Sequence, residues 1–172
     1  MTNLKKYFTV SYIKTLFTKE KIKEFIKRII SLKASSPKIA FSIALGIFIG
    51  LMIPIGLQTI ILIPIATLLG CNIFLASGAT LISNPLTMFP IYYSAVKIGE
   101  FLTGINLSWD RIEVAIMNPT WNNILSLGND GLIVFFTGSF LEGVVGGVIF
   151  YLAALYLIKK WRKKHLPAIS NS

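Results

Sequence analysis

Charge is missing from the middle of this 172-residue chain, which has no Asp, Glu, Lys, Arg or His between Ile39 and Val96. Charged residues make up 14% of the whole sequence, against about 25% in a typical soluble domain. A membrane-spanning helix needs roughly 20 mainly apolar residues, and the uncharged block is long enough for more than one. The absence argues against a soluble domain and predicts an all-α integral membrane protein.

Cysteine and histidine are almost absent as well. Cys71 is the single cysteine, which excludes a disulfide within the chain and argues against a zinc site. His165 is the single histidine and lies in a basic tail. The sequence also lacks paired carboxylates, a phosphate-binding glycine loop and metal-ligand spacing. We therefore expect no enzymatic activity, no cofactor and no metal ion.

Basic residues gather before residue 39 and again at Lys159–Lys164. Basic residues beside apolar spans usually face the cytoplasm, so both termini are predicted to be cytoplasmic, and nucleic acid is not expected as a partner. Residues 17–33 repeat apolar side chains with a helical period, which predicts a basic amphipathic helix on the membrane surface. This helix either anchors the chain or senses lipid or a partner. Its headgroup-facing residues are Lys21, Lys23, Lys27 and Arg28.

Proline and glycine divide the uncharged block into short helices, predicted at residues 38–53, 57–69, 73–82 and 85–103. The first three would each reach roughly 15–24 Å, less than the ~30 Å of hydrocarbon. Such short pieces are typical of broken helices and re-entrant hairpins. One full C-terminal span is predicted at residues 132–158.

The connector between the block and the last span differs from both, because Trp109 and Trp121 suit the membrane interface. It is poor in Lys and Arg, which places it on the outer face. With cytoplasmic termini, the block must then make a net odd number of crossings, so one pair of its helices is predicted to be re-entrant. The chain is predicted to divide into a basic interfacial segment (1–35), a membrane domain (36–162) and a cytoplasmic tail (163–172). Within the membrane domain, a broken-helix block (36–104) is followed by a connector (105–130) and a last span (131–158).

The stretch Ser83-Asn84-Pro85-Leu86-Thr87 places a helix-opening signal inside the uncharged block. About 19 Å of helix separates Asn84 from Lys97, so Asn84 lies near the midplane if Lys97 is at an interface. A helix start there would offer free N–H groups to an anion. The alternative is a structural kink in which a neighbouring helix satisfies Asn84.

A similar break precedes it, and paired breaks are typical of midplane substrate sites. The candidate substrate-binding residues are Pro54, Gly56, Gln58, Asn72, Asn84, Pro85 and Thr87.

Glu142 is the only charge in the middle of the last span. A carboxylate inside a membrane is costly and usually functional, so proton coupling is one interpretation. A structural hydrogen bond to Gln58, Asn72 or Asn84 is the other.

Small residues recur every fourth position near Glu142, at Ser139, Gly143 and Gly147. Such a face permits close helix packing. It lies either inside the protein or in a homo-oligomer interface, and the pattern fits both.

One combination of residues resembles a known family. The pattern comprises Ser36-Pro37, Gly46, Gly50, Pro54, Gly56, Gln58, Asn72, Asn84, Pro85, Thr87, Pro90 and Gly99. Over residues 36–103, with a looser fit to 162, it resembles the bacterial membrane family catalogued as domain of unknown function 2062. Glu142 is outside this pattern. Some relatives look fused to glycosyltransferases that use lipid-linked sugars, and this resemblance implies handling of polyprenyl-phosphate or glycolipid.

We therefore expect a small inner-membrane, transporter-like protein that handles an anionic or lipid-phosphate substrate at the helix breaks. The alternative is a non-transporting membrane module that anchors or organises a glycosyltransferase or another cell-envelope enzyme.

Overall fold

The computed structural model describes residue 29 and residues 34–108, 110, 112–113, 117 and 121–165. Every regular element in these residues is a helix, which confirms the all-α prediction for this part of the chain. The predicted basic helix at 17–33 lies outside the described residues except for Ile29, and so do Lys21, Lys23, Lys27, Arg28 and Trp109. The helices are α3 (Ser36–Met52), α4 (Gln58–Leu68), α5 (Ile73–Thr80), α6 (Met88–Thr103), α8 (Trp121–Leu125) and α9 (Gly128–His165).

The boundaries of α3, α4 and α5 agree with the predicted helices to within about two residues. Three other boundaries were wrong. Helix α6 begins at Met88 instead of residue 85, because Asn84 and Thr87 hold the preceding residues in a turn. Helix α9 extends beyond the predicted 132–158 at both ends. Asp130 in its first turn and lysines in its last turns are favourable there, because they complement the helix dipole.

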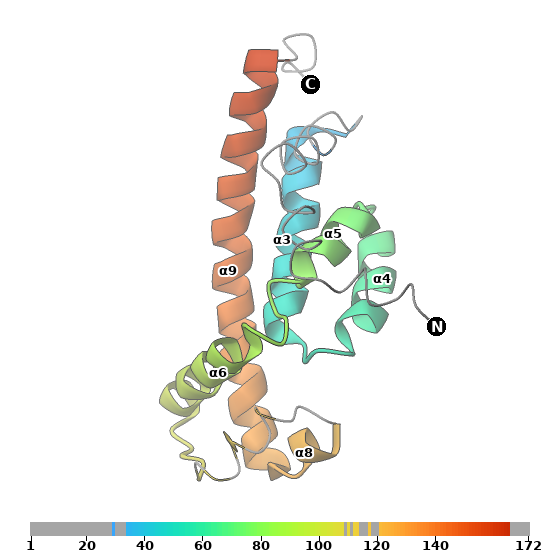
Figure 1. Cartoon of the computed structure of the whole chain (residues 1–172). Coiled ribbons are helices and arrows are strands. Elements are labelled where there is room, and N and C mark those ends of the chain that lie inside the picture. The colour runs from blue at the N-terminus through green and yellow to red at the C-terminus, as the bar shows by residue number, and fades with distance from the viewer. Residues whose placement is uncertain are drawn as a thin grey trace, which may run out of the picture.

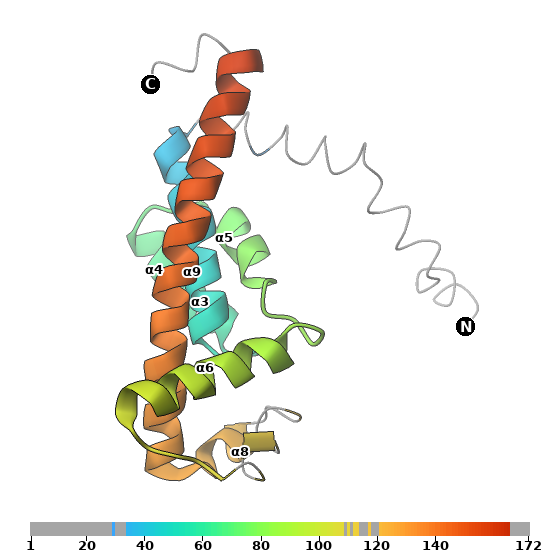
Figure 2. The same cartoon turned by 90° about the vertical axis from the view of Figure 1, so that its left-hand side faces the viewer.

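Helices α3 and α9 lie side by side and run in opposite directions (Figures 1 and 2). At one end, Nη1 of Arg162 donates to Oγ of Ser36 over 3.2 Å, so the start of α3 adjoins the end of α9. Along the contact, a Cβ added to Gly143 would lie 3.1 Å from Phe48, and one added to Gly147 would lie 3.5 Å from the carbonyl oxygen of Ala44. The small-residue face of α9 therefore packs inside the chain against α3, which answers the question that the sequence left open.

Helices α4 and α5 fold back on each other and pack beside α3 (Figure 1). The reversal uses Gly70, whose φ of +60° suits a residue without a Cβ. Gly46 brings α3 against α5 so closely that a Cβ there would overlap the carbonyl of Ala76. Leu62 and Ala66 of α4 are both fully buried in the same cluster. The pair forms a helical hairpin, and whether it is the predicted re-entrant pair stays a prediction.

Helix α6 lies across α9 instead of alongside it (Figures 1 and 2). The crossing depends on two glycines, because a Cβ on Gly99 would overlap the carbonyl of Val134, and one on Gly138 would overlap the carbonyl of Ala95. Tyr92 is buried at the same junction. The close approach fixes the direction of α6, and it also determines where the break before α6 is placed.

Helix α9 is long and apolar enough to cross a membrane, by length and composition. Only 17% of its most apolar 18-residue window is buried inside the protein. The other residues of that window are partly or fully exposed.

Candidate functional site

The break between α3 and α4 is closed by Gln58. Pro54 lacks the N–H group that would continue the helical bonding to the carbonyl of Gly50. Gln58 replaces it, because Nε2 donates to the carbonyl oxygens of Gly50 (3.1 Å) and Ile53 (2.8 Å). Gly56, at φ +99°, makes the reversal possible. The Gln58 side chain is 7% exposed, so its amide group serves the fold.

Tyr92 connects this break to α6. The N–H of Ile55 donates to Oη of Tyr92 over 2.8 Å, and the Tyr92 side chain is 2% exposed. Its ring packs edge-on against Phe135 of α9, with 5.5 Å between ring centroids. One tyrosine therefore joins the α3–α4 break, α6 and α9, a role that the sequence analysis did not assign to it.

At the break between α5 and α6, Asn84 and Thr87 bond within the turn, whereas the buried Oγ of Ser83 has no hydrogen-bond partner among the described residues. Oδ1 of Asn84 accepts hydrogen bonds from the N–H groups of Leu86 (2.9 Å) and Thr87 (3.3 Å). Nδ2 of Asn84 donates to the carbonyl oxygen of Leu81 over 3.0 Å. Oγ1 of Thr87 accepts from the N–H of Asn84 and donates to the carbonyl of Ile82. Asn84 and Thr87 thus form a compact polar turn.

The prediction that this break offers free amides is wrong at Asn84, Leu86, Thr87 and Met88. All four N–H groups donate to acceptors inside the turn, including that of Met88 to the carbonyl oxygen of Asn84 at 2.8 Å. Short polar side chains such as Asn and Thr bond readily to nearby backbone, so the residues that signal a helix start also occupy its donors. The alternative was wrong about the partner, because Asn84 bonds within its own turn and not to another helix.

The depth argument for Asn84 assumed that α6 runs along the membrane normal. In the structure α6 lies across α9 (Figure 2). If α9 crosses a membrane, the length of α6 does not measure depth, so the distance between Asn84 and Lys97 cannot place Asn84 at the midplane. The direction of α6 comes from its glycine contacts with α9, which lie beyond local sequence.

Asn72 belongs to a different place. Its Oδ1 accepts from the N–H of Leu75 over 3.0 Å and caps α5. Its own N–H donates to Oγ of Ser42 in α3 over 2.9 Å. Helix α4, roughly 16 Å long at 1.5 Å per residue, separates Asn72 from Gln58. The candidate substrate residues are therefore divided between the two ends of α4 and the turn before α6.

Glu142 pairs with Ser94 of α6, whose Oγ donates to Oε1 of Glu142 over 2.8 Å. The predicted partners Gln58, Asn72 and Asn84 each bond elsewhere. Oε2 of Glu142 is buried and has no hydrogen-bond partner among the described residues. The carboxyl group therefore joins α6 to α9 through one oxygen and leaves the other available.

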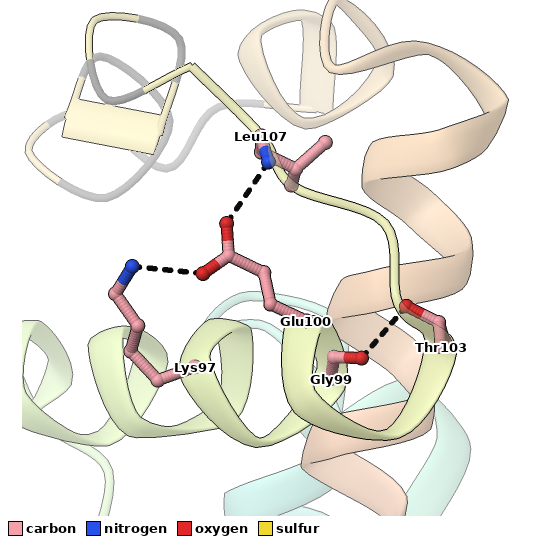
Figure 3. Close-up of polar contacts among 5 residues, drawn as sticks. All are labelled: Lys97, Gly99, Glu100, Thr103 and Leu107. Carbon is pink, nitrogen blue, oxygen red and sulfur yellow. Dashed lines mark hydrogen bonds and ion pairs between the residues drawn. The ribbon is translucent and has the colours of Figure 1, made fainter.

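Glu100 holds the connector against the end of α6 (Figure 3). Its Oε2 pairs with Nζ of Lys97 over 2.8 Å, and its Oε1 accepts from the N–H of Leu107 over 2.9 Å. Burial raises the pKa of the Glu100 carboxyl, but the bonds from Lys97 and Leu107 outweigh it and hold that pKa below its ordinary value. Thr103, which donates to the carbonyl of Gly99, closes the same end of the helix.

The roles of Tyr92, Ser94 and Glu100 as structural partners were not predicted from the sequence. A signal existed for Tyr92, because a buried tyrosine hydroxyl usually finds a hydrogen-bond partner. For Ser94 no signal existed, because nothing near it in the sequence indicates Glu142.

Comparison of the sequence with known protein families identifies the family of this chain. No curated protein and no solved structure matches this chain. The family described as uncharacterized proteins conserved in bacteria, DUF2062, matches residues 19–166 and so covers all the helices described above. The breaks, the glycine contacts and Glu142 all lie within that match, and the chain belongs to this DUF2062 family.

Proposed function

We propose that this chain is an integral protein of the bacterial inner membrane. The observation that carries the proposal is the outer surface of α4, α5, α6 and α9, where large apolar side chains face outward. Soluble monomers rarely expose continuous apolar patches larger than a few hundred Å². Lipid would cover the surface made by Ile60, Ile63, Leu68, Phe74, Phe101, Phe140, Val145, Val148, Ile149, Leu152 and Leu157, each 43–87% exposed.

In this placement α3 and α9 cross the membrane together, and α4 with α5 forms a re-entrant hairpin beside them. The start of α3 and the end of α9 adjoin, and Lys159–Lys164 follow the apolar part of α9. The positive-inside rule then assigns this end, with both termini, to the cytoplasm. The ion pair of Lys97 and Glu100 lies toward the opposite side, with the connector.

Within the membrane, the geometry favours a non-transporting module that anchors or organises a cell-envelope enzyme. A substrate site needs polar groups that are available to a ligand. At both breaks the predicted polar ligands bond to the protein's own backbone, through Gln58 at one and Asn84 with Thr87 at the other. The buried Oγ of Ser83 at the second break has no partner among the described residues. Such bonding is what a rigid, permanently buried irregular backbone requires.

A second candidate is transport of an anionic or lipid-phosphate substrate past Pro54 and Asn84, with Glu142 coupling protons. One observation favours it, because Oε2 of Glu142 is buried without a partner in the described part of the chain. A carboxyl group in that position is a candidate for binding and releasing a proton.

Complementation of a chromosomal deletion separates the two candidates. Glu142→Gln keeps the size of the side chain and a hydrogen bond from Ser94, but it removes proton exchange. A module should retain function with this variant and lose it when the basic face of residues 17–33 is neutralised. A transporter coupled through Glu142 should lose function at an unchanged membrane level. Glu113→Gln makes the same change at an exposed carboxylate of the connector and is the matched control.

A further inference from the structure

A basic pocket lies where the start of α3 meets the end of α9. It has a volume of about 550 Å³ and is lined by Ser36, Tyr156, Lys159, Lys160, Arg162 and Lys163. None of the described residues that line it is acidic. Four cationic side chains around one concavity create a positive potential that attracts an anion.

Two of the lining side chains are held in place. Arg162 is 1% exposed, and its Nη1 donates to Oγ of Ser36 over 3.2 Å. Nζ of Lys160 lies 5.6 Å from the centre of the Tyr156 ring, within the range of a cation–π contact. A planar guanidinium presents donors in a fork that matches phosphate oxygens. The pocket therefore has a fixed Arg–Ser wall instead of mobile lysines alone.

Lys159 and Lys163 complete the pocket from the solvent side. Both are exposed, and neither forms an ion pair with another described residue. They follow the apolar part of α9 directly, and Leu152 and Leu157 nearby are 58% and 61% exposed. An anion in the pocket that carries an apolar tail could lay that tail along this surface.

We propose that this pocket binds a phosphate group, and that its natural source is the headgroup of an anionic membrane lipid. The binding of phosphate depends only on the pocket, whereas the lipid source also depends on the proposed membrane placement. This role is separate from the two helix breaks and does not require transport.

The test uses the full chain purified in a zwitterionic detergent, with native mass spectrometry as the readout. The probes are phosphatidylglycerol, phosphatidylcholine and sodium phosphate. Lys163→Gln removes a lining charge, whereas Lys164→Gln removes the adjacent exposed charge, which does not line the pocket. One interfacial Lys contributes about 1 kcal/mol, or about fivefold in affinity. Because both lysines are exposed, neither variant should affect folding, and thermal unfolding checks this.

We expect phosphatidylglycerol to bind at least tenfold more tightly than phosphatidylcholine. Lys163→Gln should weaken its binding about fivefold, and Lys164→Gln less than twofold. Displacement of the lipid by sodium phosphate would assign the site to free phosphate, and persistence of the lipid would assign it to the headgroup; both outcomes support phosphate recognition. Equal effects of the two substitutions would overturn the proposal, because general surface charge would then explain the binding. Equal binding of the two lipids would also overturn it, because a pocket lined by four cations should prefer the anionic headgroup to the zwitterionic one.

Discussion

The hydrogen bond from Ile55 to Tyr92 gives a sharp test of how the α3–α4 break is held. Tyr92→Phe removes only the hydroxyl oxygen that accepts from the N–H of Ile55 at 2.8 Å. The aromatic ring stays, so its edge-on contact with Phe135 should be preserved. Because Tyr92 is 2% exposed, water is not expected to replace the lost acceptor.

The expected cost follows from the buried amide that is left unpaired. Removing one partner of a buried hydrogen bond typically costs about 1–3 kcal/mol. We therefore expect Tyr92→Phe to lower the free energy of unfolding by that amount. The exchange of the Ile55 amide hydrogen should accelerate by about 5- to 150-fold, because 1.4 kcal/mol corresponds to a factor of ten.

Equilibrium unfolding of the purified protein in mixed detergent micelles, followed by circular dichroism, measures the first quantity. Hydrogen exchange with mass spectrometry of the peptide containing Ile55 measures the second. Tyr156→Phe is the matched control, because Tyr156 is 61% exposed and its ring contact with Lys160 does not need the hydroxyl. A change below about 0.5 kcal/mol for Tyr92→Phe, equal to that of Tyr156→Phe, would refute the reasoning.

Three further predictions concern the crossing, the second break and the connector. Gly138→Ala should destabilise the protein by about 1–3 kcal/mol, because the added Cβ would overlap a backbone carbonyl of α6. Gly78→Ala is the control, since Gly78 has open space around it, and it should be neutral or stabilising in the same unfolding assay. Asn84→Ala should cost about 0.5–2 kcal/mol and speed amide exchange in its own turn while exchange in α9 stays unchanged. Because the pKa of Glu100 is held below its ordinary value, the Glu100 carboxylate stabilises the protein at any pH above that ordinary value, and this stabilisation is lost as pH falls through the pKa of the folded state. In that pH range the Leu107 amide should lose its protection from hydrogen exchange. Glu100→Gln should abolish this pH dependence.

The sequence was sufficient for the short helices of the uncharged block. Pro54 and Gly70 act locally, since one removes a donor and the other permits a positive φ, so the ends of α3 and α4 could be read directly. Glycine and serine at every fourth position also predicted a close helix contact, although only the structure identifies α3 as the partner.

The candidate site was less predictable, because its bonds join residues far apart in the chain. Ile55 reaches Tyr92 and Ser94 reaches Glu142 only after α6 has docked across α9. That docking depends on backbone carbonyls that meet glycines on another helix. The expectation of free amides at Asn84 was wrong for a local reason, since its side chain accepts hydrogen bonds from the N–H groups of Leu86 and Thr87.

Single-cysteine labelling in intact cells tests the membrane placement of α3 and α9 most directly. With the native Cys71 replaced by Ala, one cysteine is introduced at Asn106 in the connector and another, in a separate variant, at Lys164 beyond the apolar part of α9. Both positions are exposed. A membrane-impermeant maleimide should label position 106 once the outer barrier is opened, and position 164 only after the inner membrane is permeabilised. Equal labelling of the two positions before permeabilisation would contradict a crossing by α9.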